Sequence, residues 1–263
     1  MPRDLTGFLW LLKLGALANL YFLADTFALA GGADPHIVVP AQILFAVSAH
    51  RCLFPNRYED DVVLHDSFLS STFVTRVLAT FVEIAWIHQL AHVLRVLDAG
   101  QTGWVTAFSW WMVVQVVVSQ GFVWGAILTG RLSLYFFEEA GWAVIFVLNT
   151  VASAYLYGMY GTLDAAGDAR LLLQLNLLFG AVYLPWQVVH LRALRADALA
   201  SVSPAARDGG TIRDRLRRSL HDRKRATDAA SWGGWIGLVW MAAYWAVLIP
   251  PWVHQIVRVL GTR

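Results

Sequence analysis

The sequence has few charged residues for its length. Of its 263 residues, only 14% are Asp, Glu, Lys or Arg, whereas 58% are hydrophobic. Average soluble domains are about 25% charged and roughly 45–50% apolar. A soluble core of this size would need a larger charged shell, so the composition excludes a soluble enzyme, and its hydrophobicity excludes a disordered chain. We therefore expect an all-α, polytopic integral membrane protein in a bacterial-type inner membrane or a plasma membrane.

Cysteine and lysine are also scarce, and each shortage excludes a class of protein. Cys52 is the only cysteine, so no disulfide scaffold can form within the chain. The only lysines are Lys13 and Lys224. A retinal-binding protein needs a lysine in its last span to form a Schiff base. The last expected span, residues 232–260, has none, which excludes that class.

Long apolar segments divide most of the chain. A membrane-crossing helix needs about 20 mainly apolar residues, and seven segments meet this requirement. Turn-forming residues separate most of them. The expected spans are residues 7–30, 37–54, 70–97, 103–130, 132–158, 170–194 and 232–260. No fixed-period repeat is visible, so we expect residues 1–263 to form a single membrane domain, with Pro250 and Pro251 kinking its last helix.

The segment 195–231 between the last two expected spans is strongly basic. Half of the 20 Lys and Arg residues lie between Arg192 and Arg225. Because positive loops stay in the cytoplasm, we predict a cytoplasmic loop here, a cytoplasmic N-terminus and an external C-terminus. Residues 211–227 predict a short basic helix that rests on anionic lipid headgroups. No aromatic residues interleave with the cations, so we expect no nucleic acid partner.

Ionisable residues inside a membrane are costly, and the expected spans contain many of them. The larger group lies towards the predicted cytoplasmic side. Histidine and carboxylate ligands suit zinc or iron, and paired carboxylates can transfer protons. The catalytic candidates are Asp66, Arg76, Glu83, Glu138 and Glu139, and the candidate metal ligands are His50, His65 and His190.

The same residues also have a purely structural interpretation. Arg76 and Glu83 are seven residues apart and share nearly one helical face. Arg76 would then pair with Glu83 or Glu138 only to neutralise charge between helices, and the histidines would cap helix ends. Adjacent helical residues point about 100° apart, so one arginine does not easily satisfy both Glu138 and Glu139. The adjacent glutamates therefore favour a functional role for part of this group.

A smaller group of histidines lies towards the predicted external side. His88 and His92 are four residues apart and are expected to stack on one helical face. His254 of the last span and Asp25 of the first should lie at a similar depth. Two histidines from different helices can clamp a haem, and the His-x-x-x-His spacing suits a metal ion. We therefore expect His88, His92 and His254 to bind a cofactor, with interfacial hydrogen bonding as the alternative.

These residues leave three functions open. The first is an integral membrane enzyme that acts on a lipid, isoprenoid or other apolar substrate, with Arg51 or Arg76 holding an anionic headgroup. The second is a non-catalytic subunit of a larger membrane complex that binds a cofactor, pigment or lipid. The third is a proton-coupled transporter or channel in which Arg76, Glu83 and Glu138 form a relay. The sequence leaves the identity of the cofactor, a metal ion or a haem, undecided.

Overall fold

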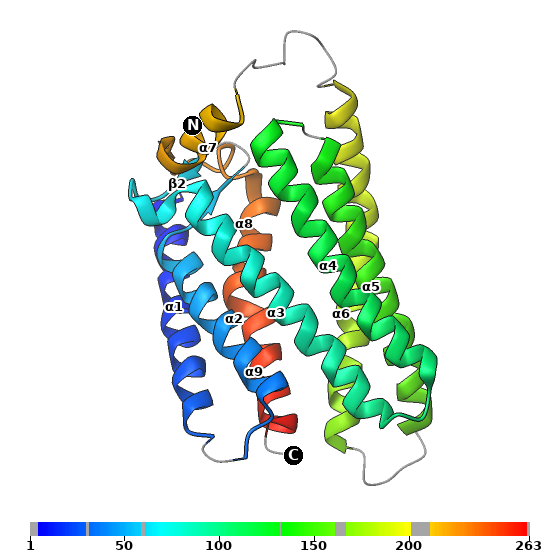
Figure 1. The fold of residues 1–263 in the computed structure, drawn as a ribbon. Coiled ribbons are helices and arrows are strands. Elements are labelled where there is room, and N and C mark those ends of the chain that lie inside the picture. The colour runs from blue at the N-terminus through cyan, green and yellow to red at the C-terminus, as the bar shows by residue number, and fades with distance from the viewer. Residues whose placement is uncertain are drawn as a thin grey trace. The chain divides into compact units, whose positions relative to one another are not determined.

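The computed structural model describes residues 5–29, 32–58, 61–131, 133–160, 167–200 and 211–261, most of which are helical (Figure 1). Six of the described helices are long and apolar enough to cross a membrane. Each of them overlaps one of the first six expected spans, so the prediction of a helical membrane protein is confirmed at this level. They are α1 (Thr6–Phe27), α2 (Pro35–Leu53), α3 (Thr72–Asp98), α4 (Gly103–Thr129), α5 (Ser133–Tyr160) and α6 (Gly167–Ala200).

Local sequence signals explain where several of these helices begin and end. The Asp34 side chain accepts a hydrogen bond from the His36 N–H, and Pro35 occupies the first turn of α2, where a missing N–H costs little. Helix α4 ends at Gly130, whose φ of +67° lies in the left-handed region that glycine tolerates best. Helix α5 begins at Ser133, so the connection between α4 and α5 is short.

The seventh expected span is not one continuous α-helix. It consists of α8 (Gly234–Ala242), the π-helical turn η3 (Ala243–Val247) and α9 (Ile249–Leu260). A proline lacks an N–H and its ring clashes with the carbonyl four residues earlier, so it kinks or breaks a helix. Pro250 and Pro251 instead lie in the first turn of α9. The expected kink is thus an interruption of the helix.

The chain forms two compact units. Unit 1 contains Met1–Trp86 and Leu216–Arg263, and unit 2 contains Ile87–Arg215. In unit 2, α5 packs against both α4 and α6. Asn176 of α6 donates hydrogen bonds to Ser153 Oγ (3.0 Å) and Asn149 Oδ1 (3.5 Å) of α5, which satisfies polar groups between these two apolar helices. The prediction of a single membrane domain stays a prediction.

Two backbone hydrogen bonds join the last part of the chain to the two ends of α1. Near the start of α1, the Leu5 N–H donates to the Thr227 carbonyl at 2.8 Å. Beyond the other end of α1, the Asp34 N–H donates to the Gly261 carbonyl at 2.9 Å. The chain between Thr227 and Gly261 therefore runs the length of α1 in the same direction (Figure 1). Helix α1 has 22 residues and is about 33 Å long at 1.5 Å per residue.

A small sheet of three two-residue strands lies at the N-terminal end of α1. Strand β1 (Asn56–Arg57) pairs antiparallel with β2 (Val62–Val63), and β2 pairs parallel with β3 (Lys224–Arg225). The expected basic helix over 211–227 is shorter in the structure, since α7 spans Ile212–His221. It ends before β3 because the N–H groups of Lys224 and Ala226 bind carbonyls beside and within β2 instead.

Part of the predicted loop 195–231 is therefore regular secondary structure. Helix α6 continues to Ala200, and α7 and β3 follow residue 211. Residues 201–210 of this predicted loop lie outside the described residues. A hydrophobic cluster packs β2 and α8 against the first half of α1. Its buried members are Leu5, Leu9, Leu12, Val62, Leu64, Trp232 and Leu238.

The π-helical turn is held by a buried amide from α1. Asn19 is fully buried, and its Nδ2 donates to the Trp245 carbonyl at 2.9 Å and to the Gly15 carbonyl at 2.8 Å. A Cβ at Gly15 would lie only 2.5 Å from Ala246 Cβ, so α1 packs closely against η3. Asn19 thus satisfies a carbonyl in the interrupted part of the last predicted span.

We expect Asn19→Ala to destabilise the protein by about 1–3 kcal/mol, because it leaves a buried carbonyl without its amide donor. The measurement is reversible unfolding in detergent micelles. Leu17→Ala is the matched control, since Leu17 lies on the same helix and is 64% exposed. Equal stability of the two variants would contradict this role for Asn19.

Candidate functional site

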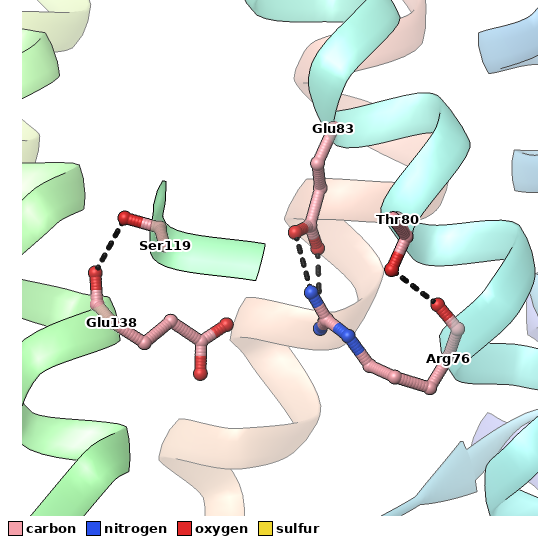
Figure 2. A network of polar contacts seen from close by, with 5 residues as sticks. All are labelled: Arg76, Thr80, Glu83, Ser119 and Glu138. Atoms are coloured by element: carbon pink, nitrogen blue, oxygen red, sulfur yellow. Dashed lines mark hydrogen bonds and ion pairs between the residues drawn. The ribbon is translucent and has the colours of Figure 1, made fainter. Parts of the chain in front are cut away.

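Arg76 and Glu83 form a buried ion pair on α3. Arg76 Nη2 lies 2.7 Å from Glu83 Oε2, and Nη1 lies 3.5 Å from Oε1 (Figure 2). The two residues are only 4% and 7% exposed. A guanidinium that donates two hydrogen bonds to one carboxylate binds it strongly and fixes its orientation. The predicted pairing of Arg76 with Glu83 is confirmed, and it takes place within one helix, across seven residues.

A second guanidinium, that of Arg51, is buried in unit 1. Its Nη1 donates to Asn56 Oδ1, and its Nη2 donates to the Asn56 carbonyl at 3.3 Å. The guanidinium carbon lies 5.1 Å from the centre of the Trp245 ring, which suits a cation–π interaction. Arg76 and Glu83 are both close enough to interact electrostatically with Arg51.

Asn56 connects Arg51 to the beginning of α3. Its Nδ2 donates to the Ser70 carbonyl (3.0 Å), in the 3-10 helix η1 (Phe68–Ser70), and to Thr75 Oγ1 (2.6 Å). From the sequence alone, Asn56 is an ordinary turn residue after Pro55, so its part in this network is missed. No local pattern predicts it, because the partners Ser70 and Thr75 are 14 and 19 residues away.

The adjacent glutamates of unit 2 have different surroundings. Glu138 is buried, and its backbone carbonyl accepts a hydrogen bond from Ser119 Oγ of α4 at 3.3 Å (Figure 2). The Glu139 side chain contacts α6, where Gln187 Nε2 donates to Glu139 Oε2 at 2.7 Å. His190 Nε2 lies 3.9 Å from Glu139 Oε1. The structure therefore brings together Glu139 and His190, two of the predicted site residues.

The remaining predicted residues of the cytoplasmic-side group lie in unit 1. Asp66 Oδ1 binds Arg223 Nε at 2.7 Å, and the Asp66 side chain is 67% exposed. An exposed pair of this kind contributes about 0–1 kcal/mol. His65 meets the Trp10 ring edge-on, and His50 lies against Phe54.

The external-side histidines fall into two separate contacts. His88 and His92 stack on α3 as expected, with ring centres 6.5 Å apart and ring planes 13° apart. They belong to unit 2. In unit 1, His254 Nε2 lies 2.7 Å from Asp25 Oδ2, which confirms that these two residues share a depth. A joint cofactor site of His88, His92 and His254 stays a prediction.

The described residues contain no group of three or more His, Cys, Asp or Glu side chains arranged to hold a metal ion. Of the three predicted metal ligands, His50 and His65 belong to unit 1 and His190 to unit 2. Their role as ligands of zinc or iron stays a prediction.

No protein-family model, curated protein or solved structure matches this chain. Its function is therefore inferred from its own residues.

We expect Glu83→Met and Arg76→Met each to destabilise the protein by about 3–5 kcal/mol. Each change removes one partner of a buried ion pair and leaves the other charge without it, and this is costlier than removing both charges. The double variant Arg76→Met/Glu83→Met should therefore be more stable than either single variant. The measurement is the free energy of unfolding of wild type, the two single variants and the double variant in the same micelles. Together these values give the coupling energy between Arg76 and Glu83. Additive losses would show that the two residues do not stabilise each other.

His65, which lies outside the long helices, should make stability depend on pH. Burial, and then the positive charges of Lys13 and Arg225, hold the pKa of His65 below its usual value of 6.5. The unfolded chain therefore takes up the proton first, and stability falls as the pH drops below about 6.5. His65→Asn should reduce this loss, while His221→Asn, at an exposed histidine, should not. The measurement is the melting temperature between pH 5 and pH 8, and an unchanged slope for His65→Asn would contradict the assignment.

Proposed function

We propose that this protein is an integral membrane enzyme that acts on a lipid, isoprenoid or other apolar substrate near the cytoplasmic side of the membrane. The observation that carries the proposal is the buried Arg76–Glu83 pair, which lies within a helix apolar enough to cross a membrane. Charged groups at membrane depth are costly, and proteins that retain them use them chiefly for binding or proton transfer. The second buried guanidinium, Arg51, supports the same conclusion.

In this proposal, carboxylates and histidines perform general acid–base catalysis. Glu83 accepts and returns a proton, while Arg76 holds the carboxylate in position through two hydrogen bonds. Glu139 and His190 form a second acid–base pair in unit 2, oriented by the Gln187 amide. Asp66 and Glu138 retain their predicted catalytic roles as part of the proposal.

The proposal includes seven membrane crossings, a cytoplasmic N-terminus and an external C-terminus. The hydrogen bonds Leu5–Thr227 and Asp34–Gly261 support the seventh crossing, because they make α8, η3 and α9 run the full length of α1. They also bring the cations Lys224 and Arg225 to the N-terminal end of α1. An excess of positive charge favours the cytoplasmic side.

Anionic lipid headgroups are the proposed partner of the basic segment. Arg217, Lys224 and Arg225 are exposed. The η1 residues Phe68 and Leu69, which follow β2 in the chain, are exposed as well. Cations combined with exposed apolar side chains are typical of segments that bind an anionic membrane surface.

A non-catalytic subunit that binds a pigment, haem or lipid is the second candidate. An aromatic cluster in unit 1 favours it: the Trp86 ring packs edge-on against Tyr244 (5.9 Å) and Trp252 (6.0 Å), and Tyr244 packs against Trp245 (4.4 Å). The absorption spectrum of the purified protein separates the candidates, because a bound haem or carotenoid gives a visible band and the enzyme proposal requires none.

The enzyme proposal predicts turnover of a membrane component. Wild-type protein in nanodiscs of total polar lipid from its expression host should change the mass of one lipid or isoprenoid class, as followed by mass spectrometry. Arg76→Met/Glu83→Met should lower that rate about 100-fold, the lower range expected for loss of a general acid–base group, while remaining folded. Asp222→Asn, at an exposed carboxylate, is the matched control and should retain the rate. The proposal fails if wild type converts no component.

A further inference from the structure

Among the described residues, the hydrogen-bond partners of the buried Arg51 guanidinium include no carboxylate. Arg51 and Arg76 are both more than nine-tenths buried, and Arg76 pairs with the Glu83 carboxylate. Within the described residues, the Arg51 guanidinium donates its hydrogen bonds to the two oxygens of Asn56, which are neutral. A buried guanidinium is stabilised best by an anion that accepts its hydrogen bonds.

The Arg51 guanidinium is held in a fixed orientation that leaves one donor edge available. Asn56 engages both terminal nitrogens and is itself anchored to Ser70 and Thr75. The guanidinium carbon lies over the indole of Trp245, 5.1 Å from the ring centre. Arg51 Nε is buried and has no hydrogen-bond partner in the described part of the chain. Nε and its neighbouring terminal nitrogen form the edge with which arginine binds phosphate or carboxylate oxygens in pairs.

The surroundings of Trp245 indicate what kind of molecule carries the anion. The Trp245 backbone carbonyl is held by Asn19 Nδ2 (2.9 Å) and Cys52 Sγ (3.4 Å), so the π-helical turn fixes the indole beneath Arg51. Tyr244 packs directly against Trp245, and Trp86 and Trp252 extend the aromatic cluster within unit 1. A cationic donor edge beside aromatic side chains suits a ligand with an anionic end and an apolar body.

We infer that Arg51, positioned by Asn56, is the binding residue for a phosphate group carried by the apolar substrate. Arg51 is favoured over Arg76 because its hydrogen-bond acceptors are the neutral oxygens of Asn56, whereas Arg76 is already paired with the Glu83 carboxylate. The inference rests on the proposed function and narrows its substrate class to phosphorylated lipids or isoprenoids. The same donor edge also suits free phosphate, which the experiment distinguishes.

The test measures binding, without turnover, by the full-length protein in nanodiscs of phosphatidylcholine. The probes are dioleoyl phosphatidic acid, dioleoylglycerol with the same chains but no phosphate, and inorganic phosphate. Thermal stabilisation and native mass spectrometry give the affinities. We expect wild type to bind phosphatidic acid at least tenfold more tightly than either other probe. Arg51→Met should lose this preference, and Arg51→Lys, which keeps the charge but lacks the paired donor edge, should weaken it.

Two further variants separate this site from its neighbours. Arg258→Gln, at an exposed cation of α9, should bind phosphatidic acid as wild type does, whereas Glu83→Gln should bind it at least as tightly because a negative charge beside Arg51 is gone. Unchanged binding by folded Arg51→Met or Arg51→Lys overturns the inference, as does equal binding of dioleoylglycerol. If inorganic phosphate binds as tightly as phosphatidic acid, the statement that the phosphate is carried by an apolar substrate is overturned. Arg51-dependent binding without any lipid conversion overturns the enzyme proposal and leaves the phosphate site standing.

Discussion

A buried guanidinium must be hydrogen-bonded wherever water is excluded, and in unit 1 this requirement is met by Asn56. Its oxygens accept from Arg51 at the end of α2, and its amide donates to Ser70 and Thr75 at the start of α3. One turn residue thus joins two long helices and places Arg51 close to the Arg76–Glu83 pair. The polar end of unit 1 depends on this network, because the Arg51 charge would otherwise be buried without a hydrogen-bond partner.

The same end of unit 1 is completed by a segment from much later in the chain. Strand β3 adds to the β1–β2 hairpin through backbone hydrogen bonds, and Trp232 packs into the hydrophobic cluster with α1. The basic segment is thereby fixed beside the N-terminal end of α1. From there the chain runs along α1 to Gly261, in the same direction as α1. The contacts of unit 1 therefore fix both the position of the basic segment and the direction of the last predicted span.

Hydropathy and local spacing predicted the first six long helices, because each needs only about 20 apolar residues between turn signals. Spacing also predicted the Arg76–Glu83 pair and the stacking of His88 on His92. Contacts between residues distant in sequence could not be predicted from hydropathy or local spacing. Strand β3 is two residues long and pairs with Val62 and Val63, and Asn56 has partners in a different helix. The π-helical turn was missed for the same reason, since Asn19 of α1 holds its carbonyl.

The central claim is that the buried charges of unit 1 lie between two water-facing ends on opposite sides of a membrane. Labelling with a membrane-impermeant maleimide tests it directly, in protein whose single cysteine, Cys52, is replaced by serine. Gly32→Cys, where a Cβ meets nothing within 4 Å, marks one end, and Asp222→Cys, at an exposed position, marks the other. We expect the residue 32 cysteine to react from outside intact cells and the residue 222 cysteine only in inside-out vesicles. Labelling of both from the same side would contradict the account.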